Sequence, residues 1–314
     1  MQHIQNASAT LMSSEGTLYH LDLKRRDGVP PNLVLVGASD RVDAIARHFD
    51  EVVFVHTNTA RPEFHSVFGV YQGSPVGAIS VGIGTPSMEI VCNELHALFE
   101  YDPHHDRWEK PSAPIHIIRL GTAGASRADI PLGAYAITRF SVGLDNAGIY
   151  YPPVPQDPES ASLEAHLQHT LFGVVNPCLY ATPAHPRVVS TLVKMASRQS
   201  SVPVVEGITT SSPGFFAAEG RTVGRLHTAF TLPEFMKAVE EFSFQDLHIV
   251  NHEMETSILL RMMHEQLRYE VGALCIILDN LRTNEIIAPA LYQRRMDDAI
   301  VVVLDSLAYL ASHT

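Results

Sequence analysis

The chain has 314 residues, 46% of them hydrophobic, and is therefore long enough to bury a large core as one α/β domain or two smaller ones. Its formal net charge is −12 and no long cluster of lysine and arginine occurs, so we expect neither nucleic acid nor an anionic membrane surface as a partner. No run approaches about 18 apolar residues and the first residues lack a basic segment followed by an apolar one, so we expect no membrane span and no secretory signal.

The three cysteines, Cys92, Cys178 and Cys275, are far apart in the sequence. They are odd in number and fit no CxxC or zinc spacing, which favours reduced thiols over a disulfide framework or a metal site. Reduced thiols in turn favour a cytoplasmic location.

The first hundred residues predict alternating strands and helices. Residues 32–39 predict a short buried strand that ends in a glycine turn, because a run of branched apolar residues precedes Gly37. The other expected elements here are a helix over 40–49, a strand over 51–57, a hairpin over 67–82 with a Gly-Ser-Pro turn, and a helix over 84–101 capped by Thr85 or Ser87.

Two polar, proline-rich segments interrupt this pattern, and we interpret them as insertions near 101–114 and 150–175. The first contains His104 and His105 beside acidic residues. Since no further ligands recur at the spacing of a metal site, a solvated surface loop is the favoured interpretation.

The segment Ile115–Ser126, IHIIRLGTAGAS, predicts a buried strand that ends at Arg119 and leads into a flexible turn with Thr122. Open α/β sheets bind ligands at the carboxyl ends of their strands, and a guanidinium beside glycine-turn amides suits phosphate. The pattern is neither a Walker loop nor GxGxxG, and taken alone a structural ion pair and a tight turn explain it equally well. Two further glycine turns, GASDRV and GIGTPS, favour the anion site.

The second half predicts further strands and helices without an internal repeat or a low-complexity linker. We therefore expect a single α/β domain over 1–314, in three layers, with a mixed central sheet between helices. The expected elements are strands over 132–143, 202–212 and 271–280, and helices over 234–242, 251–267 and 290–313.

Six motifs, taken in order, resemble the nucleoside phosphorylases with the hexameric-type fold, and most closely the uridine phosphorylases. The resemblance covers nearly the whole chain, and six motifs in the same order are far more specific than any one of them. The motifs are LYHL, GASDRV, EFHSVFGVYQGSPV leading to GIGTPS, RLGTAG, GITTSSPGFFAAEGR and NHEMETS.

The resemblance implies that Gly37, Arg41, Arg119 and Thr122 bind phosphate, with Thr122 also near the ribose. A further phosphate-binding arginine of the family, supplied by the neighbouring subunit, directly precedes the EF of its motif. Pro62 occupies that place here, and Arg61 lies one residue before it. The resemblance therefore implies that Arg61 binds phosphate from a position shifted by one residue.

For the ribose, the resemblance implies that His20 of LYHL reaches the neighbouring subunit's site, and that Glu253, Met254 and Glu255 bind the sugar. On a regular helix, residues two apart point to different sides. Both glutamates can therefore serve one sugar only if the segment is irregular or lies near a helix end.

For the base, the resemblance implies that Phe215 stacks on the ring and Arg221 binds a uracil carbonyl. The family's glutamine two residues before that arginine is Glu219 here, and an ionised glutamate accepts hydrogen bonds but cannot donate one. Asp279 instead matches an aspartate of bacterial purine nucleoside phosphorylases that protonates the departing base, and the usual uridine-phosphorylase arginine is replaced by Leu281.

The resemblance thus implies phosphorolysis of uridine, with Arg119, Arg221 and Asp279 as candidate catalytic residues and inorganic phosphate as co-substrate, and it requires no cofactor. It further implies a homo-oligomer with shared sites, a dimer or larger, and an interface cation between Glu63 and Ser87. The alternatives are a purine nucleoside phosphorylase or a nucleosidase on the same fold, and a non-catalytic nucleoside-binding protein.

Overall fold

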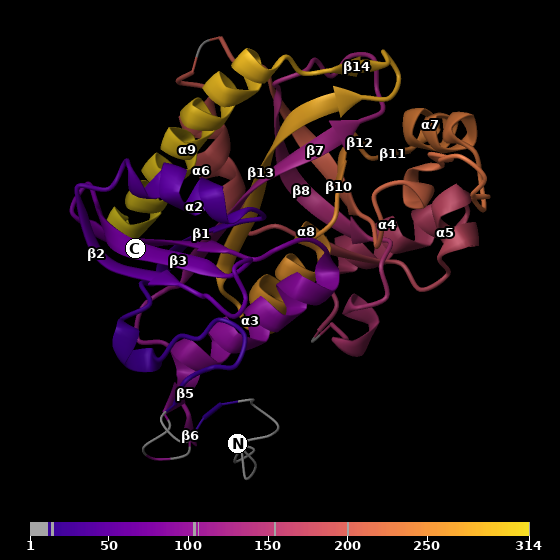
Figure 1. Cartoon of the computed structure of the whole chain (residues 1–314). Coiled ribbons are helices and arrows are strands. Elements are labelled where there is room, and N and C mark those ends of the chain that lie inside the picture. The colour runs from indigo at the N-terminus through magenta and orange to yellow at the C-terminus, as the bar shows by residue number, and fades with distance from the viewer. Residues whose placement is uncertain are drawn as a thin grey trace.

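The structure is a computed structural model and describes residues 12–13, 16–102, 105, 107–153, 155–199 and 201–313. One large mixed sheet carries most of the strands, in the order β11-β12-β10-β8-β13-β7-β1-β4-β3-β2, with β14 beside β13 and β9 beside β8. Figure 1 shows helices on both faces of this sheet. The expected three-layer α/β fold is therefore confirmed.

Most of the longer strands follow the expected apolar runs, β12 excepted. The strands of the first half are β1 (Asn32–Val36), β2 (Glu51–Thr57), β3 (His65–Tyr71), β4 (Ser74–Ser80), the short pair β5 (Tyr101–Asp102) and β6 (Arg107–Trp108), and β7 (His116–Ala125). Those of the second half are β8 (Tyr135–Gly143), β9 (Tyr180–Pro183), β10 (Val204–Ser211), β11 (Ser243–Phe244), β12 (Leu247–Glu253), β13 (Glu270–Asn280) and β14 (Glu285–Ile286).

The sheet closes on itself in its central part. β7 pairs in parallel with β13, β13 antiparallel with β8, and β8 in parallel with β10, which pairs with β12. An antiparallel contact between His252 of β12 and Gly124 of β7 completes the ring. Because β7, β12 and β13 meet there, side chains from the carboxyl halves of these strands come together at one place.

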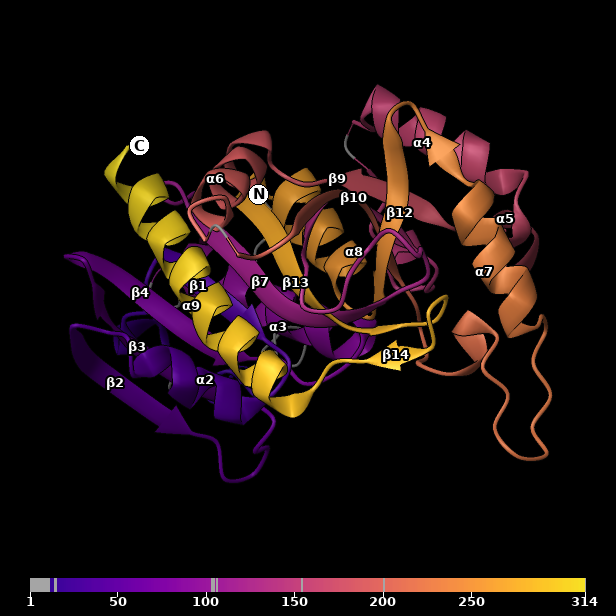
Figure 2. The same ribbon diagram turned by 90° about the horizontal axis from the view of Figure 1, so that it is seen from above.

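Helices cover the two faces of the sheet unequally, as Figures 1 and 2 show. The long C-terminal helix α9 packs with α6 on one face, where α2 covers β3 and β4, and α3 packs with α8 on the other. The helices are α2 (Ser39–Ala46), α3 (Thr85–Glu100), α4 (Pro158–Gln168), α5 (Leu171–Val175), α6 (Pro186–Ala196), α7 (Leu232–Glu241), α8 (Thr256–Leu259) and α9 (Pro289–Ser312). A π-helical segment, Leu260–Gln266, continues α8, and 3₁₀ turns span Arg25–Asp27, Gly148–Tyr150 and Ala217–Glu219.

Four sequence-based expectations about elements are wrong in detail. The β3–β4 hairpin turns at Gln72 and Gly73, which both have positive φ, and Ser74 already pairs with Tyr71 in the ladder. The residue that precedes α3 is Gly84, which makes no side-chain cap, so neither Thr85 nor Ser87 caps this helix.

The third correction concerns β7, which does not end at Arg119 but continues to Ala125. Its residues pair with β13 up to Ala125 opposite Asn280. Glycine-rich sequence therefore signals close packing inside a strand here, and not a flexible turn.

The expected helix over 251–267 begins only at Thr256, because residues 247–253 form β12. β9 and α6 are among the elements that the sequence analysis did not expect. The expected insertion near 150–175 contains α4 and α5, whose apolar side chains belong to a second core cluster with those of α7. Within the described residues, no helix is both long and apolar enough to cross a membrane.

Candidate active site

Arg119 lies in the middle of β7 and is only 4% exposed. Its guanidinium lies over Gly121, two residues on along the same face of the strand, and a Cβ built on Gly121 would overlap Nη1. The glycine after the arginine in RLGTAG therefore makes room for the guanidinium. One of its nitrogens, Nη1, donates to Sγ of Cys275 at 3.2 Å.

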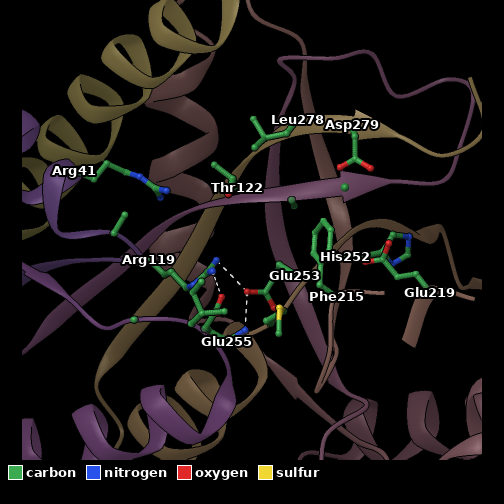
Figure 3. Close-up of a pocket in the computed structure, with 17 residues that line it drawn as sticks. Arg41, Arg119, Thr122, Phe215, Glu219, His252, Glu253, Glu255, Leu278 and Asp279 are labelled. Atoms are coloured by element: carbon green, nitrogen blue, oxygen red, sulfur yellow. Dashed lines mark hydrogen bonds and ion pairs between the residues drawn. The ribbon is translucent and has the colours of Figure 1, made fainter. Parts of the chain in front are cut away.

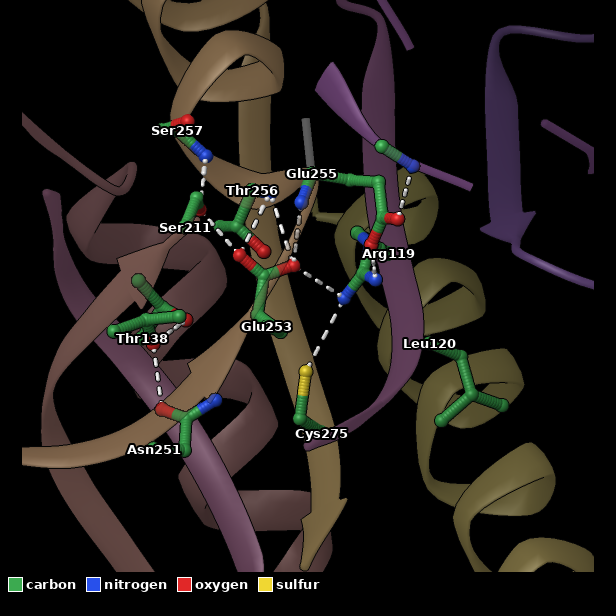
Figure 4. A network of polar contacts seen from close by, with 12 residues as sticks. Arg119, Leu120, Thr138, Ser211, Asn251, Glu253, Glu255, Thr256, Ser257 and Cys275 are labelled. Carbon is green, nitrogen blue, oxygen red and sulfur yellow. Dashed lines mark hydrogen bonds and ion pairs between the residues drawn. The ribbon is translucent and has the colours of Figure 1, made fainter. Parts of the chain in front are cut away.

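Two glutamates hold the same guanidinium, as Figure 4 shows. Arg119 Nη1 lies 3.0 Å from Oε2 of Glu253, and Nη2 forms a short ion pair with Glu255. Arg119 Nε is buried and has no hydrogen-bond partner in the described part of the chain. The group therefore keeps a donor to spare, and a buried donor without a partner is costly unless a ligand satisfies it.

The NHEMETS segment is irregular, which lets both glutamates face one site. Glu253 ends β12, Met254 lies in a bend and Glu255 is the residue before α8. Glu253 accepts hydrogen bonds from the backbone N–H groups of Glu255 and Thr256 at 3.0 and 3.1 Å, and Glu255 accepts one from Gly84 at 2.6 Å. The segment therefore meets the condition under which both glutamates can face one site.

These groups line a cavity of about 280 Å³. Figure 3 shows Arg41 and Arg119 towards one end, and Phe215, Glu219 and Asp279 towards the other. The lining residues are Gly37, Ala38, Arg41, Gly82, Ile83, Arg119, Thr122, Ala123, Gly124, Phe215, Glu219, His252, Glu253, Met254, Glu255, Leu278 and Asp279.

The end of the cavity with the two arginines is built from strand ends and glycine turns. Gly37 follows β1, Arg41 lies in the first turn of α2, and Gly82 follows β4. Arg41 Nη1 donates to the backbone carbonyl of Leu120 at 3.3 Å, which holds its guanidinium beside β7. This end can bind an anion with several oxygens.

The opposite end is aromatic and acidic. Arg221 lies behind the lining residues, 2.6 Å from Glu219 and 3.0 Å from Asp279 through Nη2, and its guanidinium lies over the Phe215 ring at 4.7 Å. The Asp279 carboxylate lies close to Gly124, where a Cβ would approach its Oδ1 to 3.0 Å.

Burial sets the protonation of several groups in the cavity. Burial raises the pKa of Glu219 to about 7, although Arg221 acts against it, and burial lowers the pKa of His252 to about 3. Burial also raises the pKa of Glu255, against the pull of Arg119. Burial alone would lower the pKa of Arg119, but Glu253 and Glu255 outweigh it and raise that pKa.

Five residues expected at the site do not line this cavity: Arg221, His20, Arg61, Glu63 and Ser87. The ring of His20 is fixed by its Nδ1 contact with Oε1 of Glu94, at 2.7 Å. Arg61 stacks on Tyr19 at 4.0 Å.

Glu63 and Ser87 both lie beside Gly82, within 4 Å of the position that a Cβ on this residue would take. The Ser87 hydroxyl donates to the Val81 carbonyl at 2.5 Å. Among the described residues, no group of three or more His, Cys, Asp or Glu side chains could hold a metal ion. His104, one of the two histidines of the polar segment, lies outside the described residues.

Sequence reasoning missed several lining residues, and His252 is the most important of them. Its Nδ1 lies 2.7 Å from Oγ1 of Thr210, and its Nε2 is buried without a partner among the described residues. Alternation along β12 gave no signal for it, since adjacent strand residues point to opposite faces and Glu253 already faces the cavity. The other missed residues are Ala38, Gly82, Ile83, Ala123, Gly124 and Leu278.

The fold and the cavity together define an α/β protein whose ligand cavity joins a guanidinium end to an aromatic and acidic end. The model of the phosphorylase superfamily matches residues 32–302, and the chain belongs to this superfamily. The resemblance carried by the six motifs is therefore confirmed.

Its relatives include several uridine phosphorylases. The chain is 25% identical to the uridine phosphorylase of Haemophilus influenzae over 94% of this chain and 99% of that protein, and 25% identical to that of Escherichia coli over 93% and 98%. The crystal structure of Trypanosoma brucei nucleoside phosphorylase, which shows uridine phosphorylase activity, matches with a TM-score of 0.85 and 27% identity over 95% and 99%. A uridine phosphorylase of Phytophthora capsici shares the fold, with a TM-score of 0.71 and 20% identity over 96% and 98%.

Proposed function

We propose that this protein is a uridine phosphorylase, which converts uridine and inorganic phosphate into uracil and ribose 1-phosphate. The observation that carries the proposal is the cavity itself, in which Arg41 and Arg119 lie opposite Phe215 and Glu219 with two glutamates between them. The full-length relatives with this activity support the same function.

Phosphate would bind at the guanidinium end, between Arg41, Arg119 and the amides of the turns at Gly37 and Gly82. Two guanidinium groups lie near Glu253 and Glu255 at this end, so an incoming anion does not meet an excess of negative charge. Nε of Arg119 provides a donor that has no partner among the described residues. Thr122, which also lines the cavity, offers a hydroxyl between phosphate and sugar.

The ribose would lie over Glu253, Met254 and Glu255, whose carboxylates accept hydrogen bonds from sugar hydroxyls. As the glycosidic bond lengthens, positive charge develops on the ribose and negative charge on the base. A carboxylate and a phosphate near the sugar stabilise the positive charge on the ribose, and Arg221 near the base stabilises the negative charge on the base. The proposed mechanism needs no redox cofactor or catalytic metal. Inorganic phosphate is the second substrate.

Asp279 favours the purine alternative, because it lines the base end where a protonated carboxyl could donate to a departing purine. Its Oδ2, however, accepts from Arg221 at 3.0 Å, so this carboxyl group is already engaged by the guanidinium. We therefore rank uridine ahead of inosine.

The test is to mix uridine with the enzyme, with and without phosphate, and to identify ribose 1-phosphate by ³¹P NMR and uracil and free ribose by chromatography. A phosphorylase releases uracil and ribose 1-phosphate, and releases neither when phosphate is omitted. Free ribose that forms without phosphate would identify a nucleosidase, and bound uridine without any turnover would identify a binding protein.

We also propose a homo-oligomer in which His20 and Arg61 complete a neighbouring subunit's site. Neither residue lines the cavity of its own chain, and Asn58 ties them together, because it donates to the His20 carbonyl and accepts from the Arg61 N–H. Tyr19, on which the Arg61 guanidinium stacks, is 54% exposed and so is available to a neighbouring chain.

An interface cation held by Glu63 and Ser87 stays a proposal, carried only by the family resemblance. A cytoplasmic location and a role in pyrimidine salvage are proposals of the same kind. The three unpaired cysteines, two of them buried, support a reducing compartment.

A further inference from the structure

The base end of the cavity holds three charged side chains that share one cluster. Arg221 contacts Oε2 of Glu219 through both Nε, at 2.8 Å, and Nη2, at 2.6 Å, and its Nη2 also contacts Asp279 at 3.0 Å. If both carboxyl groups were ionised, one guanidinium would face two negative charges. Glu219 is only 5% exposed, so the surplus charge would be poorly hydrated.

No other lining group at this end compensates for the surplus. His252 of β12 faces Glu219 in Figure 3, but burial, with Arg221 nearby, lowers its pKa to about 3, so its imidazole is neutral. Phe215 contributes only an aromatic face. The remaining cations that line the cavity, Arg41 and Arg119, lie at the opposite end.

We propose that Glu219 binds the base as a neutral carboxylic acid, whose O–H donates to a ring carbonyl and whose carbonyl oxygen accepts the adjacent ring N–H. This inference rests on the proposed function, because uracil presents that pair of groups. A carboxylic acid matches the pair with two hydrogen bonds. An ionised carboxylate would instead place lone pairs against the lone pairs of the ring carbonyl.

Burial decides which of the two carboxyl groups carries the proton. The Glu219 side chain is 6% exposed and the Asp279 side chain 20%, so ionisation costs more hydration at Glu219. Burial, supported by the charge of Asp279 and opposed by Arg221, raises the pKa of Glu219 to about 7. Asp279 then remains the counter-ion of Arg221.

The sign of the pH dependence follows. Below about pH 7 the free enzyme already carries the proton, and base binding is at full strength. Above it, the enzyme must take up a proton to bind uridine, so the affinity falls by up to about tenfold per pH unit. Glu219→Gln supplies a donor and an acceptor at every pH, which removes this dependence.

The experiment is a calorimetric titration of the enzyme with uridine, in buffers of different ionisation enthalpy, to count the protons taken up. Sulfate fills the phosphate site throughout, because it does not titrate in this range and prevents turnover. We expect about 0.9 proton taken up per site at pH 8 and about 0.1 at pH 6. Glu219→Gln should take up none at either pH.

Glu265→Gln is the matched control, because burial also raises the pKa of Glu265, which pairs with Arg261 away from the cavity. This variant should keep the wild-type uptake, whereas Asp279→Asn should lower the pKa of Glu219, because the charge of Asp279 helps to raise it. Glu255, whose pKa is also raised, is present in every variant and cannot explain a loss specific to Glu219→Gln.

Two results would overturn the inference. One is uridine binding at pH 8 without proton uptake, and the other is an uptake that Asp279→Asn abolishes and Glu219→Gln does not. A separate assay of uracil release from uridine and phosphate distinguishes these two results from failure of the proposed function. If uracil is released but no proton is taken up, only the inference fails. If uridine is neither bound nor cleaved, the proposed function fails and the inference with it.

Discussion

Arg119 has two functions in this account. It neutralises Glu253 and Glu255, which are both buried, and it provides the guanidinium on which the proposed phosphate site depends. Removing the side chain would leave two buried carboxylates without a counter-ion, which typically costs about 3–5 kcal/mol of stability. Substitution by alanine would therefore confuse loss of fold with loss of function.

Arg119→Lys separates the two functions. Lysine keeps the positive charge but lacks the planar fork that contacts two carboxylates and an anion together. We expect a folded protein whose kcat/KM for phosphate falls by about a hundredfold, the scale of losing one preorganised donor. Steady-state kinetics at limiting phosphate and circular dichroism measure the two effects.

Arg127→Lys is the matched control, since Arg127 pairs with Asp129 through Nη2 at 3.0 Å and does not line the cavity. It should retain wild-type kinetics. Wild-type kcat/KM for phosphate in a folded Arg119→Lys enzyme would argue against Arg119 as a phosphate ligand.

At the scale of elements, β7 pairs with a neighbouring strand on each side and also carries residues of the candidate site. It pairs with β1 and β13, and its glycines leave space for side chains that cross its surface. Gly121→Ala tests this packing. A Cβ there would overlap Nη1 of Arg119 and approach Sγ of Cys275 to 2.9 Å.

We expect Gly121→Ala to lower the free energy of unfolding by about 1–3 kcal/mol, as overpacking of a tight interior does. Displacement of the guanidinium should also lower kcat/KM by about a hundredfold. Denaturant unfolding and kinetics measure the two effects. Gly214→Ala is the control for stability, because a Cβ there meets nothing within 4 Å. Equal stability of the two variants would contradict the close packing of Arg119 on Gly121.

Most large elements of the fold could be predicted from apolar runs, because buried strands such as β1 and β13 are continuously hydrophobic. The exceptions have physical reasons. RLGTAG looks like a turn because glycine is permissive, but here the glycines make space for side chains. NHEMETS has helical spacing, but its first residues pair with β10 as part of β12.

The candidate site could be predicted in part. Motifs identified the residues at both ends of the cavity, but could not show that Arg221 lies behind Glu219 and Asp279. They also missed His252, because a buried histidine on a strand looks like an ordinary core residue. The positions of Arg221 and His252 depend on how strands far apart in the sequence pair, and a local sequence pattern carries no information on that pairing.

At the scale of the whole molecule, a shared site predicts complementation between inactive variants. His20→Ala removes what one chain gives its neighbour, and Arg119→Lys damages a chain's own cavity. When the two are co-expressed, half of the dimers are mixed and each mixed dimer has one intact site. About a quarter of wild-type activity should return. No activity above that of the separate variants, or a fully active monomer by light scattering, would show that each chain forms a complete site.

The most direct test of the account is the ratio of kcat/KM for uridine to that for inosine at saturating phosphate. Arg221 at the base end can stabilise the uracil anion, whereas Asp279, the group that would protonate a departing purine, is engaged by Arg221 as a counter-ion. The account predicts that uridine is the better substrate, and that Arg221→Ala lowers uridine turnover more than Asp279→Asn does. A higher kcat/KM for inosine, abolished by Asp279→Asn, would contradict the account and make Asp279 the acid of a purine nucleoside phosphorylase.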